Sequence, residues 1–323
     1  MNKLCYRIVF NRARRMLVVV SELARAHGGA CGGGSGRRGG SLCARITPLS
    51  FALWLASGLV GGAQAAGIVA DKGAAGHQQP TVVNAANGLP QVNIQTPNDK
   101  GLSHNKFSQF DVDKRGAILN NSSVNTKTQL AGMVAANPWL AKGEAKVILN
   151  EVNSRNPSQL NGFVEVAGKK ADVIIANPAG ITCSGCGFIN ANRSTLTTGA
   201  SRIENGQLKG FDVEGGQIRV EGGGMNDQSD YTQLIARSVT VNARLQANNL
   251  QVTTGRNQTD VQGNVTRVKA DDGRDKPAFA LDVAALGGMY AGKIALVGTE
   301  RGVGVRRRRR RRERRSAWRS GCR

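Results

Sequence analysis

The sequence is poor in aromatic residues, which make up 4% of the chain, and it contains only three histidines. Proteins that hold single-stranded nucleic acid use aromatic side chains on which the bases stack, so this scarcity argues against that class of partner. The apolar run at residues 49–60 is also too short for a transmembrane helix, which needs roughly 20 residues. The sequence therefore predicts a mature protein without a membrane-spanning helix.

The positive charge is concentrated at the two ends of the chain. The formal net charge is +22, of which residues 1–65 carry +8 and residues 306–323 carry +10. Residues 66–305 are left with +4. A phosphate-binding groove requires Lys and Arg spread along a folded face, and the central region lacks that pattern. We therefore expect no specific nucleic-acid partner.

Residues 1–65 have the features of an export signal. Basic residues precede the apolar run 49–60, and Ala63-Gln64-Ala65 follows it as a small-x-small cleavage site. This arrangement predicts cleavage after Ala65. The alternative is a buried core helix, which the positive flank and the Ala-Gln-Ala ending disfavour.

The signal is unusually long. Residues 1–22, which contain Tyr6-Arg7-Ile8-Val9-Phe10, resemble the extended signal-peptide region of very large bacterial exoproteins and autotransporters. Residues 23–45 follow as a Gly-rich, flexible spacer. The resemblance implies a Gram-negative bacterium and export through the inner membrane.

Only two of the six cysteines, Cys183 and Cys186, lie in the central region. A redox site of this spacing needs a helix N-terminus, whereas the flanking residues predict strand and turn. Zinc needs four ligands, and the two histidines of the central region, His77 and His104, are distant in sequence from the cysteines. We therefore expect no metal or cofactor. A short structural disulfide suits an oxidising compartment, and a free thiol pair is the alternative.

From residue 81 onward, short runs alternate apolar and polar residues and are separated by Gly or Asn. Examples are residues 92–95, 147–152, 163–166 and 218–220. This alternation predicts half-buried strands joined by tight turns, and hence an all-β protein. Residues 239–252 hold three short strands in quick succession, which fits the three faces of one β-helical coil. The pattern alone is compatible with a sandwich, a barrel or a β-helix.

Two Asn-Pro motifs lie in the central region. They are Asn137-Pro138-Trp139-Leu140 and Asn177-Pro178-Ala179-Gly180-Ile181. With the long signal and the strand at 147–152, they resemble the secretion domain of two-partner-secretion exoproteins, which are filamentous-haemagglutinin-like adhesins and contact-dependent toxins. The resemblance covers residues 66–305. Trp139 and Ala179 stand where the family motifs have Asn.

The resemblance implies a fold and a partner. The implied fold is a right-handed parallel β-helix with an N-terminal cap and extra-helical β-hairpins. The implied partner is an outer-membrane β-barrel transporter with periplasmic domains, which delivers the protein to the cell surface or the medium. In the full-length family, the remainder of the chain meets a host cell or a neighbouring cell. Such a domain starts the fold and is not an enzyme.

The resemblance also implies site residues. Those that match the family motifs are Asn137, Pro138, Leu140, Asn177, Pro178, Gly180 and Ile181. Their side chains either shape turns between strands or contact the transporter. Asn and Pro restrict a turn, and Gly supplies positive φ, so we favour the turn-forming role. Both roles stay open at this point.

Other functions have weaker support. A β-helical polysaccharide-degrading enzyme needs clustered carboxylates, and the nearest approaches are the pairs Asp111/Asp113 and Asp271/Asp272, which suit solvated turns. Residues 306–323 form an Arg-rich tail without strand alternation. We interpret this tail as the result of a frameshift or truncation near Arg306. The alternative is a basic arm that makes this chain a short surface-binding module.

Overall fold

The computed structural model describes residues 6–11, 16–21, 67–270, 273, 276–284, 288–301 and 303–307. The chain separates into two compact units, residues Met1–Leu59 and Val60–Arg323. In the first unit, β1 (Tyr6–Asn11) and β2 (Met16–Ser21) form an antiparallel hairpin. The predicted spacer, apolar run and cleavage site at Ala65 lie outside the described residues.

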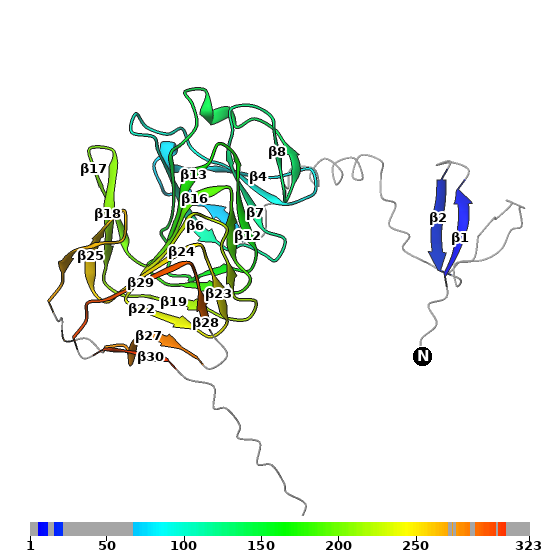
Figure 1. Ribbon diagram of the computed structural model, residues 1–323. Helices are drawn as coiled ribbons and strands as arrows, with labels where there is room; N and C mark the ends of the chain where they lie inside the picture. Colours follow the sequence, from blue (N-terminus) through cyan, green and yellow to red (C-terminus); the bar gives the residue numbers. More distant parts are fainter. Residues whose placement is uncertain are drawn as a thin grey trace, which may run out of the picture. The chain divides into compact units, whose positions relative to one another are not determined.

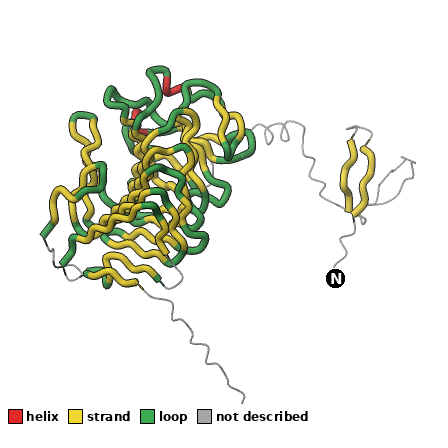
Figure 2. The backbone as a smooth tube through the Cα atoms, viewed as in Figure 1, coloured by secondary structure: helices red, strands yellow, loops and turns green. Residues whose placement is uncertain are grey.

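The second unit is a solenoid whose coils contribute strands to three long faces (Figures 1 and 2). Face 1 contains β3 (Ile68–Ala70), β6 (Leu102–Phe110), β10 (Val147–Val152), β13 (Ala171–Ala176), β16 (Ala191–Thr197), β21 (Tyr231–Ala236), β24 (Asn249–Thr254) and β29 (Lys293–Gly298). Face 2 contains β11 (Ser158–Leu160), β14 (Ile181–Cys183), β19 (Gln217–Val220), β22 (Ser238–Val241), β27 (Phe279–Val283) and β30 (Gly304–Arg307).

Face 3 is formed by two sheets that meet at a bridge between Cys186 and Met225. The first sheet contains β4 (Thr81–Asn84), β5 (Pro90–Asn93), β7 (Ala117–Asn121), β12 (Phe163–Gly168) and β15 (Gly187–Ile189). The second contains β20 (Met225–Asn226), β23 (Arg244–Gln246) and β28 (Gly288–Tyr290). Most neighbouring strands on the three faces run parallel, so the unit is a parallel β-helix, as expected from the resemblance.

The core lies inside the coils, where identical positions of successive strands stack on one another. On face 1, Leu196 pairs with Leu234, and Leu234 pairs with Val252. Each of these side chains is at most 1% exposed. Complete burial of one such side chain contributes about 2 kcal/mol, so a column of aliphatic side chains repeated at each coil holds the solenoid together. The three strands predicted within residues 239–252 are β22, β23 and β24, one on each face.

The N-terminal end of the solenoid carries additional elements. β3 runs antiparallel to β6, and β4 runs antiparallel to β5. Two 3-10 helices, η1 (Gly76–Gln78) and η2 (Pro138–Leu140), lie in the connections. The hairpin of β8 (Thr126–Thr128) and β9 (Gly132–Val134) is held by the buried Glu165, whose carboxylate accepts the backbone N–H groups of Gln129 and Leu130 at 2.7 and 2.8 Å.

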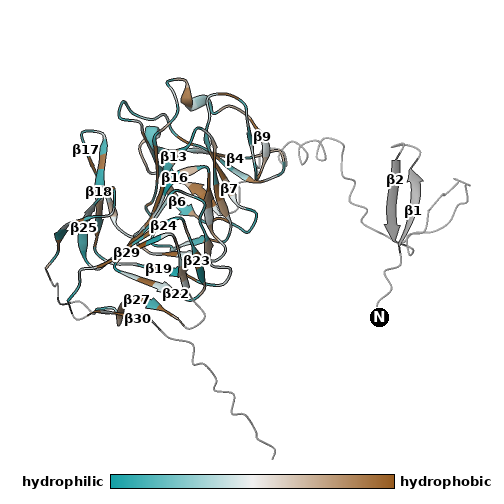
Figure 3. Ribbon diagram, in the orientation of Figure 1, coloured by the Kyte–Doolittle hydropathy of each residue, from teal (hydrophilic) through white to brown (hydrophobic). Residues whose placement is uncertain are grey.

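A separate antiparallel sheet stands outside the coils beside face 1 (Figure 1). Its strands are β17 (Ala200–Glu204), β18 (Gln207–Val213), β25 (Asn257–Asp260) and β26 (Val265–Val268). We call it the outer sheet. Phe211 packs with Leu149, Ile174 and Ile235 of face 1 in a small second core. β25 is hydrophilic along its length (Figure 3). The predicted extra-helical hairpins are therefore present.

The C-terminal boundary differs from the prediction. Strand alternation was expected to end at residue 305, but β30 includes Arg306 and Arg307. Arg306 donates from Nε to an Asp282 oxygen at 2.9 Å, and its guanidinium lies over the Phe279 ring, 4.2 Å from the centroid. These contacts accommodate a charged residue in the strand. The remaining tail lies outside the described residues.

Candidate functional site

The first Asn-Pro motif forms the turn that leads into η2. Asn137 is 2% exposed, and its side-chain amide donates to the carbonyl oxygens of Ile94 and Asn120, both at 2.9 Å. Its Oδ1 accepts the backbone N–H of Trp139 at 3.0 Å. The amide therefore satisfies two strand carbonyls and the first free N–H of η2, a side-chain-to-backbone arrangement typical of helix N-caps.

The second Asn-Pro motif repeats this arrangement between β13 and β14. Asn177 is fully buried, and its amide donates to the carbonyl oxygen of Asn156 at 2.9 Å and to Ser158 Oγ at 3.0 Å. Its Oδ1 accepts the backbone N–H of Ala179 at 2.9 Å. Since Asn156 and Ser158 belong to the preceding coil, the side chain of Asn177 ties two coils together at a corner.

The later positions of the motifs complete these turns. Gly180 has φ of +122°, and its N–H donates to the Asn177 carbonyl at 3.0 Å. A side chain there would be strained, since L residues rarely adopt this φ. Ile181 and Leu140 are each 1% exposed and belong to the main core. Thus each motif begins with a buried asparagine and ends with a buried aliphatic side chain.

The middle positions of both motifs face outward. Pro138 and Pro178 are exposed, and Trp139 is 43% exposed. The indole Nε1 of Trp139 donates to Thr81 Oγ1 at 3.2 Å, so the ring lies against the edge strand β4. In the folded domain, the prolines and the variable third positions are thus the parts of the motifs that another protein can reach.

Cys183 and Cys186 are joined by a disulfide across the turn between β14 and β15. Both residues are buried, at 0% and 1% exposure. Gly185, in the turn between them, has φ of +95°, and its N–H donates to the Gly224 carbonyl of the following coil at 2.6 Å. The bridge therefore restrains a corner of the solenoid and closes only a two-residue loop.

His104, which was considered as a zinc ligand, forms structural contacts. His104 Nε2 lies 2.9 Å from Glu151, and His104 Nδ1 lies 3.0 Å from the Gln78 amide, which links η1 to face 1. Burial raises the pKa of Glu151, but the hydrogen bond and charge of His104 outweigh it and leave that pKa below its ordinary value. The pair is one link in the attachment of the N-terminal cap.

Asp111 and Asp113 take part in structural contacts. Asp111 accepts the backbone N–H of Gln159 at 2.7 Å, and Asp113 pairs with Arg115 at 3.3 Å in an exposed turn. Asp271 and Asp272 lie outside the described residues. Within the described ranges, no group of three or more His, Cys, Asp and Glu side chains is arranged to hold a metal ion. No helix in that part of the chain is long and apolar enough to cross a membrane.

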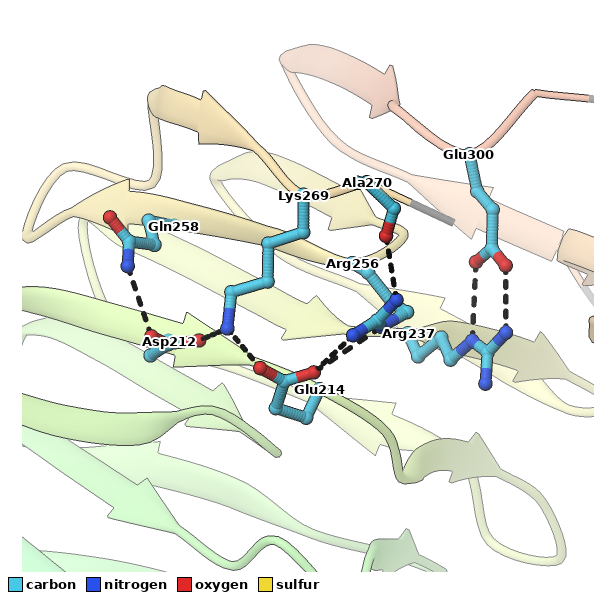
Figure 4. A network of polar contacts seen from close by, with 8 residues as sticks. All are labelled: Asp212, Glu214, Arg237, Arg256, Gln258, Lys269, Ala270 and Glu300. Atoms are coloured by element: carbon cyan, nitrogen blue, oxygen red, sulfur yellow. Dashed lines mark hydrogen bonds and ion pairs between the residues drawn. The ribbon is translucent and has the colours of Figure 1, made fainter. Parts of the chain in front are cut away.

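A polar network that the sequence did not suggest fastens the outer sheet (Figure 4). Lys269 pairs with both Asp212 and Glu214, and Arg256 Nη2 donates to Glu214 at 2.6 Å. The hydrogen bonds from Lys269 and Arg256 lower the pKa of Glu214 to about 2. Arg237 and Glu300 form a second, more buried pair at 2.7 Å nearby. The network joins β18 to β26, which are distant in sequence.

The described contacts define a β-helical domain whose motifs build turns. Comparison with known proteins agrees with this class. Residues 66–321 match the family described as TPS secretion domain, and residues 1–51 match the extended signal peptide of the type V secretion system. The chain therefore belongs to the two-partner-secretion domain family, a non-catalytic transport domain that implies a partner outer-membrane transporter.

Individual relatives support the same assignment. The chain is 59% identical over 309 residues to a protein named toxin CdiA from Yersinia pestis, and 44% identical over 312 residues to a tRNA nuclease CdiA-2 from Burkholderia pseudomallei. Each match covers 94% of this chain but only 9% and 10% of the relative. This sequence thus spans about a tenth of the length of these relatives.

A solved structure also matches. The crystal structure of a filamentous hemagglutinin secretion domain is 36% identical, with a TM-score of 0.69, over 75% of this chain and 82% of that chain. The predicted family and the β-helix are confirmed. The extended signal and the secretion domain together indicate export to the cell surface or the medium.

Proposed function

We propose that residues 66–305 serve as the export address and the folding template of a longer exoprotein. The observation that carries this proposal is the burial of Asn137 and Asn177, each of which makes three side-chain hydrogen bonds that close a corner of the solenoid. Backbone groups at these corners would otherwise be buried without partners, at a cost of about 1–3 kcal/mol each. We therefore assign the motifs to fold nucleation first.

The proposed route begins with removal of residues 1–65 after Ala65 and continues in the periplasm. There the partner's periplasmic domains receive the mature chain before it folds. The disulfide between Cys183 and Cys186 closes only a short loop, so it adds little width to an extended chain. Once outside, each coil stacks on the previous one, and this stepwise burial of apolar columns drives the chain outward without a periplasmic energy source.

The activity of the full-length protein lies beyond these residues. The relatives whose printed names are toxin and tRNA nuclease are about ten times longer than the matched segment. We propose that the domain serves the export of a cargo of that kind, which acts on a neighbouring cell. A filamentous adhesin that binds a host cell is the second form of cargo, in keeping with the hemagglutinin relative.

The decisive experiment measures secretion of the chain from a Gram-negative host, with and without the partner outer-membrane transporter. We expect the protein in the medium only when the transporter is present, with Ala66 as its first residue. Retention in the periplasm in both cases would overturn the export role. Mature protein that begins elsewhere would move the boundary of the domain.

A second measurement separates nucleation from recognition. Purified N177A protein is refolded from urea without transporter and compared with A179N, which alters the more accessible third position. We expect N177A to lose both refolding yield and secretion, and A179N to keep both. An N177A protein that refolds normally but is not secreted would assign Asn177 to transporter recognition instead.

A further inference from the structure

A groove runs along the outside of face 1, beneath the outer sheet. Two adjoining cavities of about 180 and 250 Å³ form it, and they share Arg193 and Gln262. Face 1 provides the floor. The wall comes from Gln207 and Leu208 of β18 and from the turn between β25 and β26, where Val261 and Asn264 lie. The groove is separate from the Asn-Pro motifs and from the network of Figure 4.

The strand register places the floor residues of the larger cavity in two rows. In the first row, Arg193 is level with Tyr231, and Asn249 is level with Lys293 on the next strands. In the second row, Gln233 is level with Gln251. Since neighbouring strands lie about 4.8 Å apart, the four strands from β16 to β29 place these side chains along roughly 14 Å. The polar side chains therefore form a ladder along the groove.

The floor of the smaller cavity is more apolar. Leu102, Val147 and Ile174 line it from below, and Leu208 and Val261 line it from the outer sheet. Leu102 and Ile174 are only 6% and 5% exposed, because they pack with Leu208 in the small second core and contribute little accessible surface. The groove thus continues from a polar ladder to an apolar floor, with Arg193 at the junction.

Several polar groups in the groove can form further hydrogen bonds. The Nε atom of Arg193 is buried and has no hydrogen-bond partner, and its Nη1 makes only a long contact of 3.4 Å to the Val261 carbonyl. The guanidinium lies 5.5 Å from the centroid of the Tyr231 ring, which is 53% exposed. Gln251 is half-buried and Lys293 is exposed, and both line the larger cavity. Groups of this kind are the usual contacts of a polar ligand.

The charges favour an acidic ligand. Lys100, Arg193 and Lys293 line the groove, and Asp172 is the only carboxylate among the lining residues of the two cavities. Burial raises the pKa of Asp172, while the nearby charge of Arg193 acts in the opposite direction. Arg binds carboxylates in a fixed, two-pronged geometry that Lys cannot match, so Arg193 is suited to orient an acidic group.

We propose that this groove binds an acidic oligosaccharide, in which a sugar ring lies on the exposed ring of Tyr231 while carboxylates face Arg193 and Lys293. The Gln251 amide matches sugar hydroxyls, which both donate and accept hydrogen bonds. The Asn249 amide already donates to the Asp230 carbonyl at 2.8 Å, and its oxygen can accept from a hydroxyl. A peptide fits less well, because β16, β21 and β24 are each paired on both sides, so these floor strands offer no backbone ladder. This binding function does not depend on the proposed export function.

The test measures binding of a uronic-acid hexasaccharide to the whole purified chain by isothermal titration calorimetry. Maltohexaose, a neutral hexasaccharide, is the matched ligand. We expect the uronic-acid ligand to bind at least tenfold more tightly than maltohexaose. We expect Y231A to weaken its binding at least tenfold and K293Q to weaken it severalfold, with a smaller dependence on salt.

The chain itself provides a matched control. Tyr290 is 57% exposed and lies under Arg244, 5.2 Å from the guanidinium, but it lines neither cavity of the groove. The variant Y290A should therefore bind the uronic-acid ligand as tightly as the unaltered protein. Equal losses of affinity in Y231A and Y290A would overturn the proposal. Unchanged affinity in both Y231A and K293Q would also overturn it, and would assign the binding to the Arg-rich tail. Absence of any binding at millimolar ligand would overturn it as well.

Discussion

At the N-terminal end of the β-helix, face 1 and face 3 each finish in an antiparallel strand, whereas at the C-terminal end all three faces finish in a parallel strand. β3 and β4 reverse direction against β6 and β5. β28, β29 and β30 run parallel to β23, β24 and β27. A reversed strand covers the edge of the parallel sheet and interrupts the winding of the coils at this end.

The apolar side chains at the two ends follow the same division. Near the N-terminal end, Ile68 and Leu140 are each 1% exposed. At the C-terminal end, Ile294, Leu296 and Val297 of β29 are 41%, 46% and 38% exposed. Their exposure matches a surface on which a further coil of a longer chain would stack. The two ends therefore differ in both strand direction and apolar exposure, and the C-terminal end is the one suited to a further coil.

The largest expected effect comes from breaking the capped end. In N137A, the carbonyls of Ile94 and Asn120 and the N–H of Trp139 lose their partner, so we expect the free energy of unfolding to fall by about 3 kcal/mol. Urea denaturation followed by circular dichroism measures this change. N242A removes an exposed asparagine and should stay within about 0.5 kcal/mol. Equal effects of the two variants would contradict the role of Asn137 in the cap.

The next largest effect is expected in the middle coils, where the disulfide is removed. The double variant C183S/C186S loses a bridge that closes a short loop, which corresponds to about 2 kcal/mol in the chain-entropy model. We expect a single unfolding transition at lower urea concentration. Two separate transitions would show instead that the two ends unfold independently.

A smaller effect concerns the attachment of the outer sheet. Glu214 has a folded-state pKa of about 2, below its ordinary 4.5, because Lys269 and Arg256 donate to it. Its contribution is therefore complete above pH 4.5 and is lost as the pH falls toward 2. Since the side chain is 53% exposed, we expect this contribution to stay below about 1 kcal/mol.

Urea denaturation of the unaltered protein and E214Q at pH 6 and pH 2.5 measures that contribution. The stability difference between them should shrink at the lower pH. The variant D99N, at an exposed position, serves as the control and should show no such difference at either pH. A gap that stays constant between pH 6 and pH 2.5 would exclude Glu214 as the titrating group.

The smallest effect is expected at the open end. L296K places a charge on a side chain that is already 46% exposed, so the stability of this chain should change by less than about 0.5 kcal/mol. In a longer chain whose next coil covers β29, the same substitution would bury a charge and should be strongly destabilising. Equal small effects in both lengths would contradict stacking on this surface.

Much of this architecture was predictable because its signals are local. Alternation within 239–252 identified the three strands of one coil, and the Asn-Pro motifs identified the family. The end of β30 was not predictable, since Arg306 enters the strand through its pairing with Asp282, 24 residues earlier. The groove on face 1 and the polar network of the outer sheet could not be predicted from the sequence either. Lys269 meets Glu214 across 55 residues, and Arg193 contacts Val261 across 68 residues.

The β-class, the export signal with its family, and the positions of the turns follow from short segments of the sequence, because strand alternation and Asn-Pro-Gly chemistry act over a few neighbouring residues. The burial of Asn137 and Asn177 and the exposure of Trp139 are visible only in the folded domain. The same holds for which end of the solenoid is closed and which polar side chains share a groove. These properties depend on the register of stacked coils, which brings together residues that are distant in the chain.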